Sequence, residues 1–110
     1  MQIHIRTDNH IHGGERLIES VTQGLQTSFE RFEHQLTRLE VHLADVNGPK
    51  GAANDKRCLI EARLAGHQPI VASHQATTVD ESVDGASEKL FRAIETTLSR
   101  LHPAKGPQTS

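Results

Sequence analysis

Apolar and polar residues alternate in four segments of the chain, which is the pattern of strands that bury one face. Near the N-terminus, Ile3 and Ile5 alternate with polar neighbours, and Cys58 and Ile60 do the same in the middle of the chain. The alternation predicts four strands, at residues 2–6, 36–46, 56–64 and 70–75.

Two other segments repeat their apolar residues every three or four positions, the spacing of a helix with one buried face. The first predicted helix runs from about Glu15 to His34. The second follows Thr78, which with Glu81 has the spacing of a capping box. We expect this helix to end near Leu101, before Pro103.

The order strand, helix, three strands and helix predicts an α+β fold. Gly- and Pro-containing turns between the last three strands indicate an antiparallel meander. A helix joins the first two strands, so we expect them to be parallel neighbours with a right-handed crossover. The expected architecture is a two-layer β-α-β-β-β-α sandwich, a four-stranded mixed sheet with two helices on one face. Residues 1–102 would form a single domain and residues 103–110 a flexible tail.

The composition limits the kinds of partner. The chain has 110 residues, a net charge of -2 and 12 Lys and Arg against 14 Asp and Glu, so any RNA-binding surface must be local. Three Phe, with neither Tyr nor Trp, nearly exclude aromatic platforms for bases. One cysteine, Cys58, rules out an intrachain disulfide and fits a reducing compartment, the cytoplasm. No apolar segment has the length of a membrane helix.

Basic residues on exposed faces of the predicted elements are the candidate RNA-binding residues, because cations must approach phosphates. Three lie on the second helix away from its apolar stripe, three project from the third strand opposite Cys58 and Ile60, and two flank the turn between the first helix and the second strand. In that order they are Lys89, Arg92 and Arg100; Lys56, Arg57 and Arg63; and Arg31 and Arg38. The alternative is an ordinary solvated face, since acids lie among them.

Other chemistry has weak support in the sequence. His10 and His12 beside Asp8 have donor atoms for a metal, but no second cluster stands at a recognisable spacing. Cys58 lies on an apolar strand face without an adjacent base, which favours packing over nucleophilic chemistry. Phosphate-binding loops, nucleophile elbows and zinc knuckles are not found. We therefore expect no metal, no cofactor, no small-molecule substrate and no enzymatic activity.

Residues 83–90, Val-Asp-Gly-Ala-Ser-Glu-Lys-Leu, resemble a stretch of the ribosome hibernation-promoting factor and ribosome-associated inhibitor family, also called the sigma-54 modulation protein family. That family has Ala-Ile-Asp, three residues and Asp-Lys-Leu there, and Arg92 falls on a basic family position. The resemblance covers roughly residues 1–102. It implies a fold like that of double-stranded-RNA-binding domains, binding to the small ribosomal subunit through 16S rRNA under stress, and no catalysis, DNA or membrane partner.

The chain departs from this family at positions expected to meet RNA. Gly24 and Thr27 stand at typical lysine positions of the first helix, and Asp80 replaces an aromatic residue. The basic run that ends the second helix is thinned. The chain resembles the short forms, which lack the added dimerisation domain. These departures leave open a second hypothesis, a diverged protein-interaction module of the same fold without ribosome binding.

Overall fold

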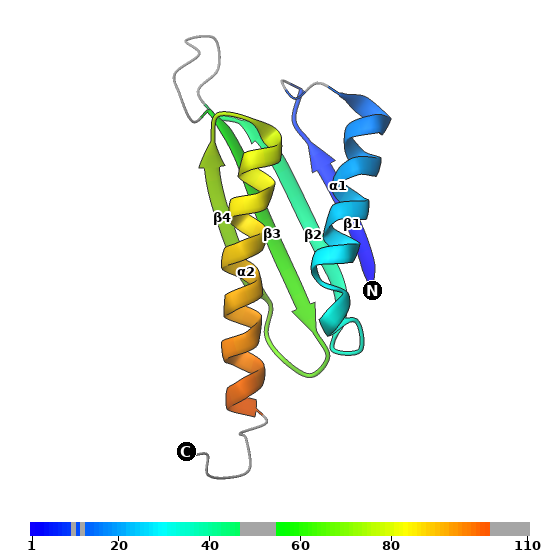
Figure 1. The fold of residues 1–110 in the computed structure, drawn as a ribbon, viewed down its shortest axis with the longest axis vertical. Helices are drawn as coiled ribbons and strands as arrows, with labels where there is room; N and C mark the ends of the chain where they lie inside the picture. The colour runs from blue at the N-terminus through cyan, green and yellow to red at the C-terminus, as the bar shows by residue number, and fades with distance from the viewer. Residues whose placement is uncertain (10, 12, 47–54, 102–110) are drawn as a thin grey trace.

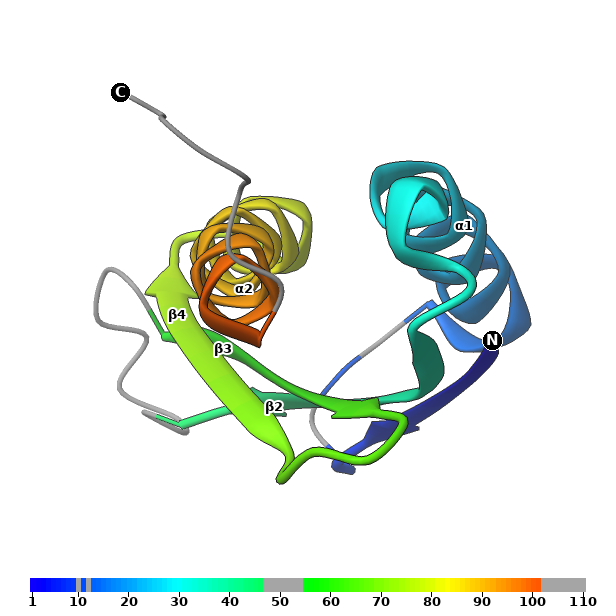
Figure 2. The same cartoon turned by 90° about the horizontal axis from the view of Figure 1, so that it is seen from below.

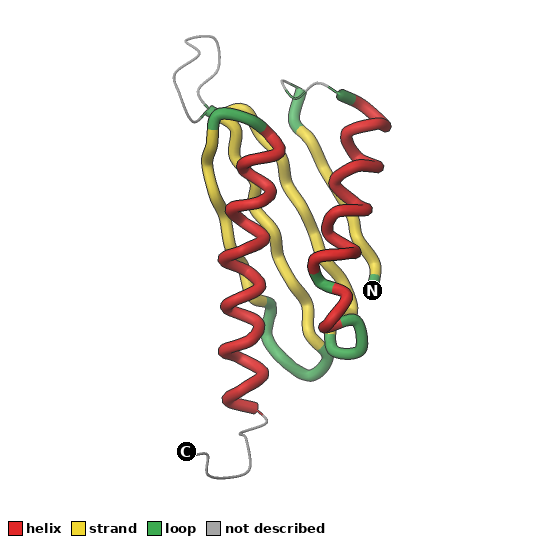
Figure 3. Tube along the Cα trace, in the orientation of Figure 1, coloured by secondary structure: helices red, strands yellow, loops and turns green. Residues whose placement is uncertain are grey.

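The computed structural model describes residues 1–9, 11, 13–46 and 55–101. Several predicted features lie outside these residues. They are the predicted tail 103–110, most of the loop before the third strand, and both His10 and His12. The elements, coloured by type in Figure 3, follow the predicted order. They are β1 (Gln2–Thr7), α1 (Gly14–Ser28), the 3₁₀ turn η1 (Glu30–Phe32), β2 (Leu36–Asp45), β3 (Lys56–Leu64), β4 (Ile70–Ala76) and α2 (Val79–Leu101).

The four strands form one mixed sheet in the order β1-β2-β3-β4. β1 runs parallel to β2, with Ile3 opposite Leu39, and the other two pairs are antiparallel. Both helices lie over the same face of this sheet, α1 near β1 and α2 near β4 (Figures 1 and 2). The predicted α+β sandwich is therefore confirmed, including its mixed sheet.

The hydrophobic core lies between the sheet and the helices. Alternate residues of the two central strands point into it, among them Val41 of β2 and Ile60 of β3, both fully buried. Leu25 of α1 and Leu90 and Ile94 of α2 cover them. No helix in the described part of the chain is long and apolar enough to span a membrane.

The first helix is shorter than its pattern predicts. The periodicity suggested a helix to about His34, whereas α1 ends at Ser28 and η1 follows. A 3₁₀ turn has three residues per turn, so Phe29 and Phe32 fall on the same side although the α-helix has ended. Both rings remain buried and both contact Phe91 of α2. The tighter turn therefore keeps the apolar spacing and lets the chain turn back into β2.

The second helix begins as its sequence predicts. The backbone N–H of Glu81 donates to Thr78 Oγ1 over 3.1 Å, the hydroxyl half of the expected capping box. Ser82, fully buried, donates through its hydroxyl to the carbonyl of Val79. These contacts set the start of α2 at Val79, above the end of the sheet where β4 finishes.

Candidate nucleic-acid interface

Both helices lie on one face of the sheet, so no described helix covers the other face (Figure 2). The strand register puts alternate residues of all four strands on this side. We call it the open sheet face. It consists of Gln2, His4 and Arg6 of β1; Arg38, Glu40, His42 and Ala44 of β2; Arg57, Leu59, Glu61 and Arg63 of β3; and Val71, Ser73 and Gln75 of β4.

Two of the predicted arginines on the open sheet face have a carboxylate partner on their own strand. Arg38 forms an ion pair through Nε with Glu40, and Arg63 lies 3.8 Å from Glu61. Each pair joins residues two positions apart, which point to the same side of a strand. Because the carboxylates stay beside the guanidinium groups, the attraction of these two arginines for phosphate is largely cancelled.

Two other arginines of the open sheet face are free of such partners. Arg57, which the sequence predicted, and Arg6, which it did not, form no ion pair with any described residue. Arg6 lies opposite His42, and Arg57 lies opposite Ala44. The sequence contains the information needed to find Arg6. Residues 2–6 alternate as in a strand, and a parallel pairing of the first two strands places Arg6 on this face.

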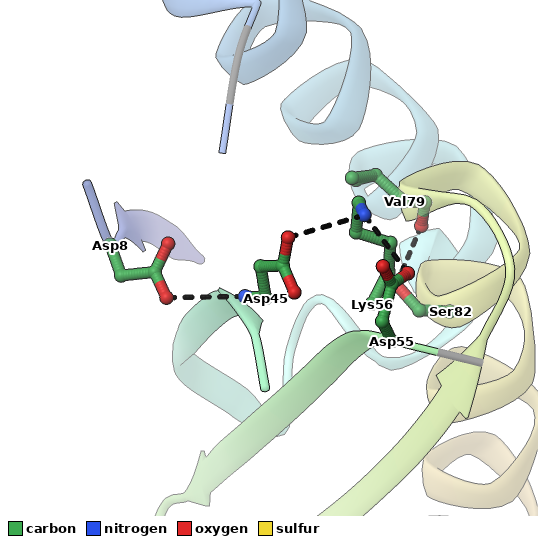
Figure 4. A network of polar contacts seen from close by, with 6 residues as sticks. All are labelled: Asp8, Asp45, Asp55, Lys56, Val79 and Ser82. Carbon is green, nitrogen blue, oxygen red and sulfur yellow. Dashed lines mark hydrogen bonds and ion pairs between the residues drawn. The ribbon is translucent and has the colours of Figure 1, made fainter. Parts of the chain in front are cut away.

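Lys56 does not lie on the sheet face that the sequence predicts for it. We expected it to project opposite Cys58, but residues two apart on a strand share a face, and Lys56 is on the helix side of the sheet. Its Nζ contacts Asp55 over 2.9 Å and Asp45 over 3.5 Å, and Asp8 accepts from the backbone N–H of Asp45 (Figure 4). The hydrogen bond to Asp55 raises the pKa of Lys56, desolvation opposes it, and the charges of Asp45 and Asp55 add to the rise. Lys56 therefore joins the ends of β2 and β3, and Asp8 joins the end of β1 to them through Asp45.

Some of the basic residues around the helices also have ion-pair or hydrogen-bond partners. Arg92 pairs with Glu88 one turn earlier, and Arg31 pairs with Glu95 over 2.9 Å. Lys89 donates to the carbonyl of Ser73 on β4. Arg100 is exposed and forms no ion pair with the described residues.

The eight predicted residues therefore occupy three different places. Arg38, Arg57 and Arg63 are on the open sheet face, Lys56 is at the sheet end, and the other four belong to the helix layer. Five of the eight have a carboxylate partner, namely Arg31, Arg38, Lys56, Arg63 and Arg92. The pairs of Arg31 and Arg92 are exposed, and such pairs contribute about 0–1 kcal/mol, so a phosphate can displace the carboxylate there. The role of these residues in RNA binding stays a prediction.

The helices α1 and α2 stand side by side over the sheet (Figure 2), and the residues that line the hollows between them define a groove. Three adjoining hollows form it, and their lining on the α1 side includes Ser20, Gly24 and Ser28. We call it the interhelix groove. Its α2 side carries four carboxylates, Asp80, Asp84, Glu88 and Glu95, and the last two pair with Arg92 and Arg31, which also line the groove. The typical lysine position filled by Gly24 thus faces an acidic surface.

Cys58 has the character of a core residue. It is fully buried, and burial raises the pKa of its thiol to about 12. A thiol with such a pKa is protonated at neutral pH and is a poor nucleophile and metal ligand. Among the described residues, no three His, Cys, Asp or Glu side chains gather into a metal site.

The fold and these surfaces define a small two-layer α+β domain with an open, arginine-bearing sheet face. Over residues 3–102 the sequence matches the family described as Sigma 54 modulation protein / S30EA ribosomal protein. The chain belongs to this family, which is one of ribosome-associated proteins. No curated protein matches the sequence.

Two solved structures share the fold. A ribosomal subunit interface protein from Coxiella burnetii superimposes with a TM-score of 0.71 at 13% identity, over 90% of this chain and 99% of the other. The N-terminal domain of Protein Y from Thermus thermophilus does so with a TM-score of 0.61 at 15% identity, over 92% and 96%. At these identities the likeness establishes the fold and not the binding residues.

Proposed function

We propose that this protein is a ribosome hibernation factor that binds the small ribosomal subunit through rRNA in the cytoplasm under stress, without enzymatic activity. The observation that carries the proposal is the family match over residues 3–102. The positively charged side chains that we assign to the contact are those without a carboxylate partner among the described residues. They are Arg6, Arg57, Lys89 and Arg100, with Arg16 on the exposed side of α1.

We expect this contact to depend on a few positively charged side chains and not on the net charge of the protein. Each cation that meets a phosphate displaces a condensed counterion, so binding weakens as salt rises. With a net charge of -2 the molecule as a whole does not attract RNA. Few cations among the described residues lack a carboxylate partner, so we expect a shallower salt dependence than that of a strongly basic protein.

Sedimentation with small ribosomal subunits tests the proposal. The chain is expected to sediment with subunits from starved cells at low salt and to leave them as salt rises. Replacing Arg57, Lys89 and Arg100 together with alanine should shift it to the free fraction. A chain that remains free at low salt contradicts the proposal.

A matched control separates local charge from net charge. Changing Gln23, Gln26 and Gln35 to glutamate also lowers the net charge by three, at exposed positions. If the three cations contact rRNA, this control should sediment nearly as the unchanged protein does. Equal loss in both variants would mean that net charge, and not these cations, governs binding.

Removing the carboxylate partners should strengthen binding. Changing Glu61, Glu88 and Glu95 to glutamine frees Arg63, Arg92 and Arg31 while keeping side-chain size. A plot of the logarithm of the binding constant against the logarithm of salt concentration should steepen by about 0.7 to 0.9 for each freed cation that meets a phosphate. Titration of labelled 16S rRNA at several salt concentrations measures this slope.

The control for this variant carries the same charge change elsewhere. Glu19, Glu33 and Glu81 are exposed and form no ion pair with any described residue. Their replacement by glutamine should leave the slope nearly unchanged. If both triple variants steepen the slope alike, the ion pairs do not mask RNA-binding cations.

The acidic interhelix groove favours a second function, a protein-interaction module without ribosome binding. Four carboxylates of α2 line the groove, and two of them, Asp80 and Asp84, form no ion pair with the described residues. Such a groove suits a basic protein segment. Recovery of one stoichiometric protein partner without rRNA in a pull-down, with no ribosome sedimentation, would support this function over the first.

A further inference from the structure

A hollow opens on the open sheet face, between β2 and β3. It has a volume of about 300 Å³ and is lined by His42, Ala44, Arg57 and Leu59. In the antiparallel register His42 is opposite Leu59 and Ala44 is opposite Arg57, so the four residues form two neighbouring cross-strand pairs. The small side chain of Ala44 leaves the space that the larger neighbours surround.

The lining of the hollow is mainly apolar, although two of its four residues carry planar side chains. Leu59 is half-buried, and His42 and Arg57 are exposed residues that line the hollow with it. Imidazole and guanidinium planes are groups on which unpaired bases of RNA stack. The hollow therefore combines an apolar surface with two stacking groups, although the chain has no Tyr or Trp.

The charge around the hollow matches the RNA backbone. Arg6 lies beside His42 on the neighbouring strand, and neither Arg6 nor Arg57 forms an ion pair with a described residue. The carboxylates nearest along the same face, Glu40 and Glu61, are each paired with an arginine of their own strand. A nucleotide placed here would meet stacking groups at its base and a free guanidinium at its phosphate.

We propose that this hollow binds an unpaired nucleobase of single-stranded RNA, with His42 and Arg57 stacking on the base and Arg6 contacting the adjoining phosphate. The inference rests on the proposed function, since it takes RNA as the partner. It adds to that function a contact that recognises bases, whereas the scattered cations recognise phosphates alone. An acidic protein segment fits the charges but makes no use of the planar side chains of His42 and Arg57.

The test compares a short single-stranded RNA with an abasic RNA of equal length and charge, each titrated into the full chain. The intact RNA should bind about fivefold more tightly, the size of one stacked base. In the variants Arg57→Lys, which keeps the charge but loses the plane, and His42→Ala, this preference should disappear. The matched control Arg63→Lys, on the same strand and face but outside the hollow, should retain it.

The outcomes separate this inference from the proposed function. Equal binding of intact and abasic RNA by the unchanged protein overturns the nucleobase site, even if the chain sediments with ribosomes. A base preference in a chain that does not sediment supports the site and contradicts the ribosomal role. Displacement of the intact RNA by polyglutamate, with no base preference, would assign the hollow to an acidic protein partner and overturn the inference.

Discussion

Replacing Phe29 with alanine is expected to lower the free energy of unfolding by about 3 to 5 kcal/mol. Phe29 is fully buried, and its ring centroid lies 6.0 Å from that of Phe91. Its backbone N–H donates to Leu25, a bond that alanine keeps, so the loss comes from the cavity and from the missing ring contact. A small domain is stable by about 5 to 15 kcal/mol, so the variant loses a large part of its stability. Urea unfolding followed by circular dichroism measures it.

A second truncation, on the helix α1 that ends just before Phe29, serves as the control. Ile18 is 38% exposed, so its change to alanine removes little buried surface and should cost less than about 1 kcal/mol. If Phe29→Ala cost no more than Ile18→Ala, the ring would not hold α1 and α2 together through Phe91.

Replacing Gly85 with alanine is expected to lower the free energy of unfolding by about 1 to 3 kcal/mol. Alanine normally stabilises a helix by about 1 kcal/mol relative to glycine. At Gly85, however, an added Cβ would overlap Cγ and Cδ2 of His74, a half-buried ring on β4. The ring must move, and α2 packs less closely on the sheet. Urea unfolding again gives the value.

Two further variants test this explanation, because in them the change in the free energy of unfolding should have the opposite sign. In a chain that already carries His74→Ala, the change Gly85→Ala should be neutral or stabilising by up to about 1 kcal/mol, because the overlap is gone. Gly24→Ala on α1, where the added Cβ meets no atom within 4 Å, should stabilise in either background. Loss of stability in all three variants would mean that the contact with His74 is not the cause.

The fold was predictable because its signals are local. Alternation marks the strands, as with Ile3 and Ile5, and three-or-four spacing marks the helices. The end of α1 was not predictable in this way, because a 3₁₀ turn keeps Phe29 and Phe32 on one side and so continues the helical pattern. The period of hydrophobic residues reports which side is buried, and it does not report which helix type places them there.

The candidate surface was less predictable, because charge partners depend on distance in space. Glu88 stands four residues before Arg92, so their pairing on a helix was readable. Arg31 and Glu95 are 64 positions apart, and their contact needs the packing of η1 against α2. The hollow at Ala44 likewise depends on the register of β2 against β3. The wrong prediction for Lys56 has another cause. Lys56 and Cys58 are two positions apart in the sequence, so the sequence alone shows that they share a strand face.

The bond from Lys89 to the carbonyl of Ser73 bears on how the protein behaves in a concentrated solution. β4 is an outer strand of the sheet, and unpaired backbone groups on such a strand can recruit a strand from another molecule. The ammonium group of Lys89 occupies one of its carbonyls and places a charge there. The same lysine that is a candidate for RNA contact therefore also discourages self-association along this edge, so its loss would favour aggregation.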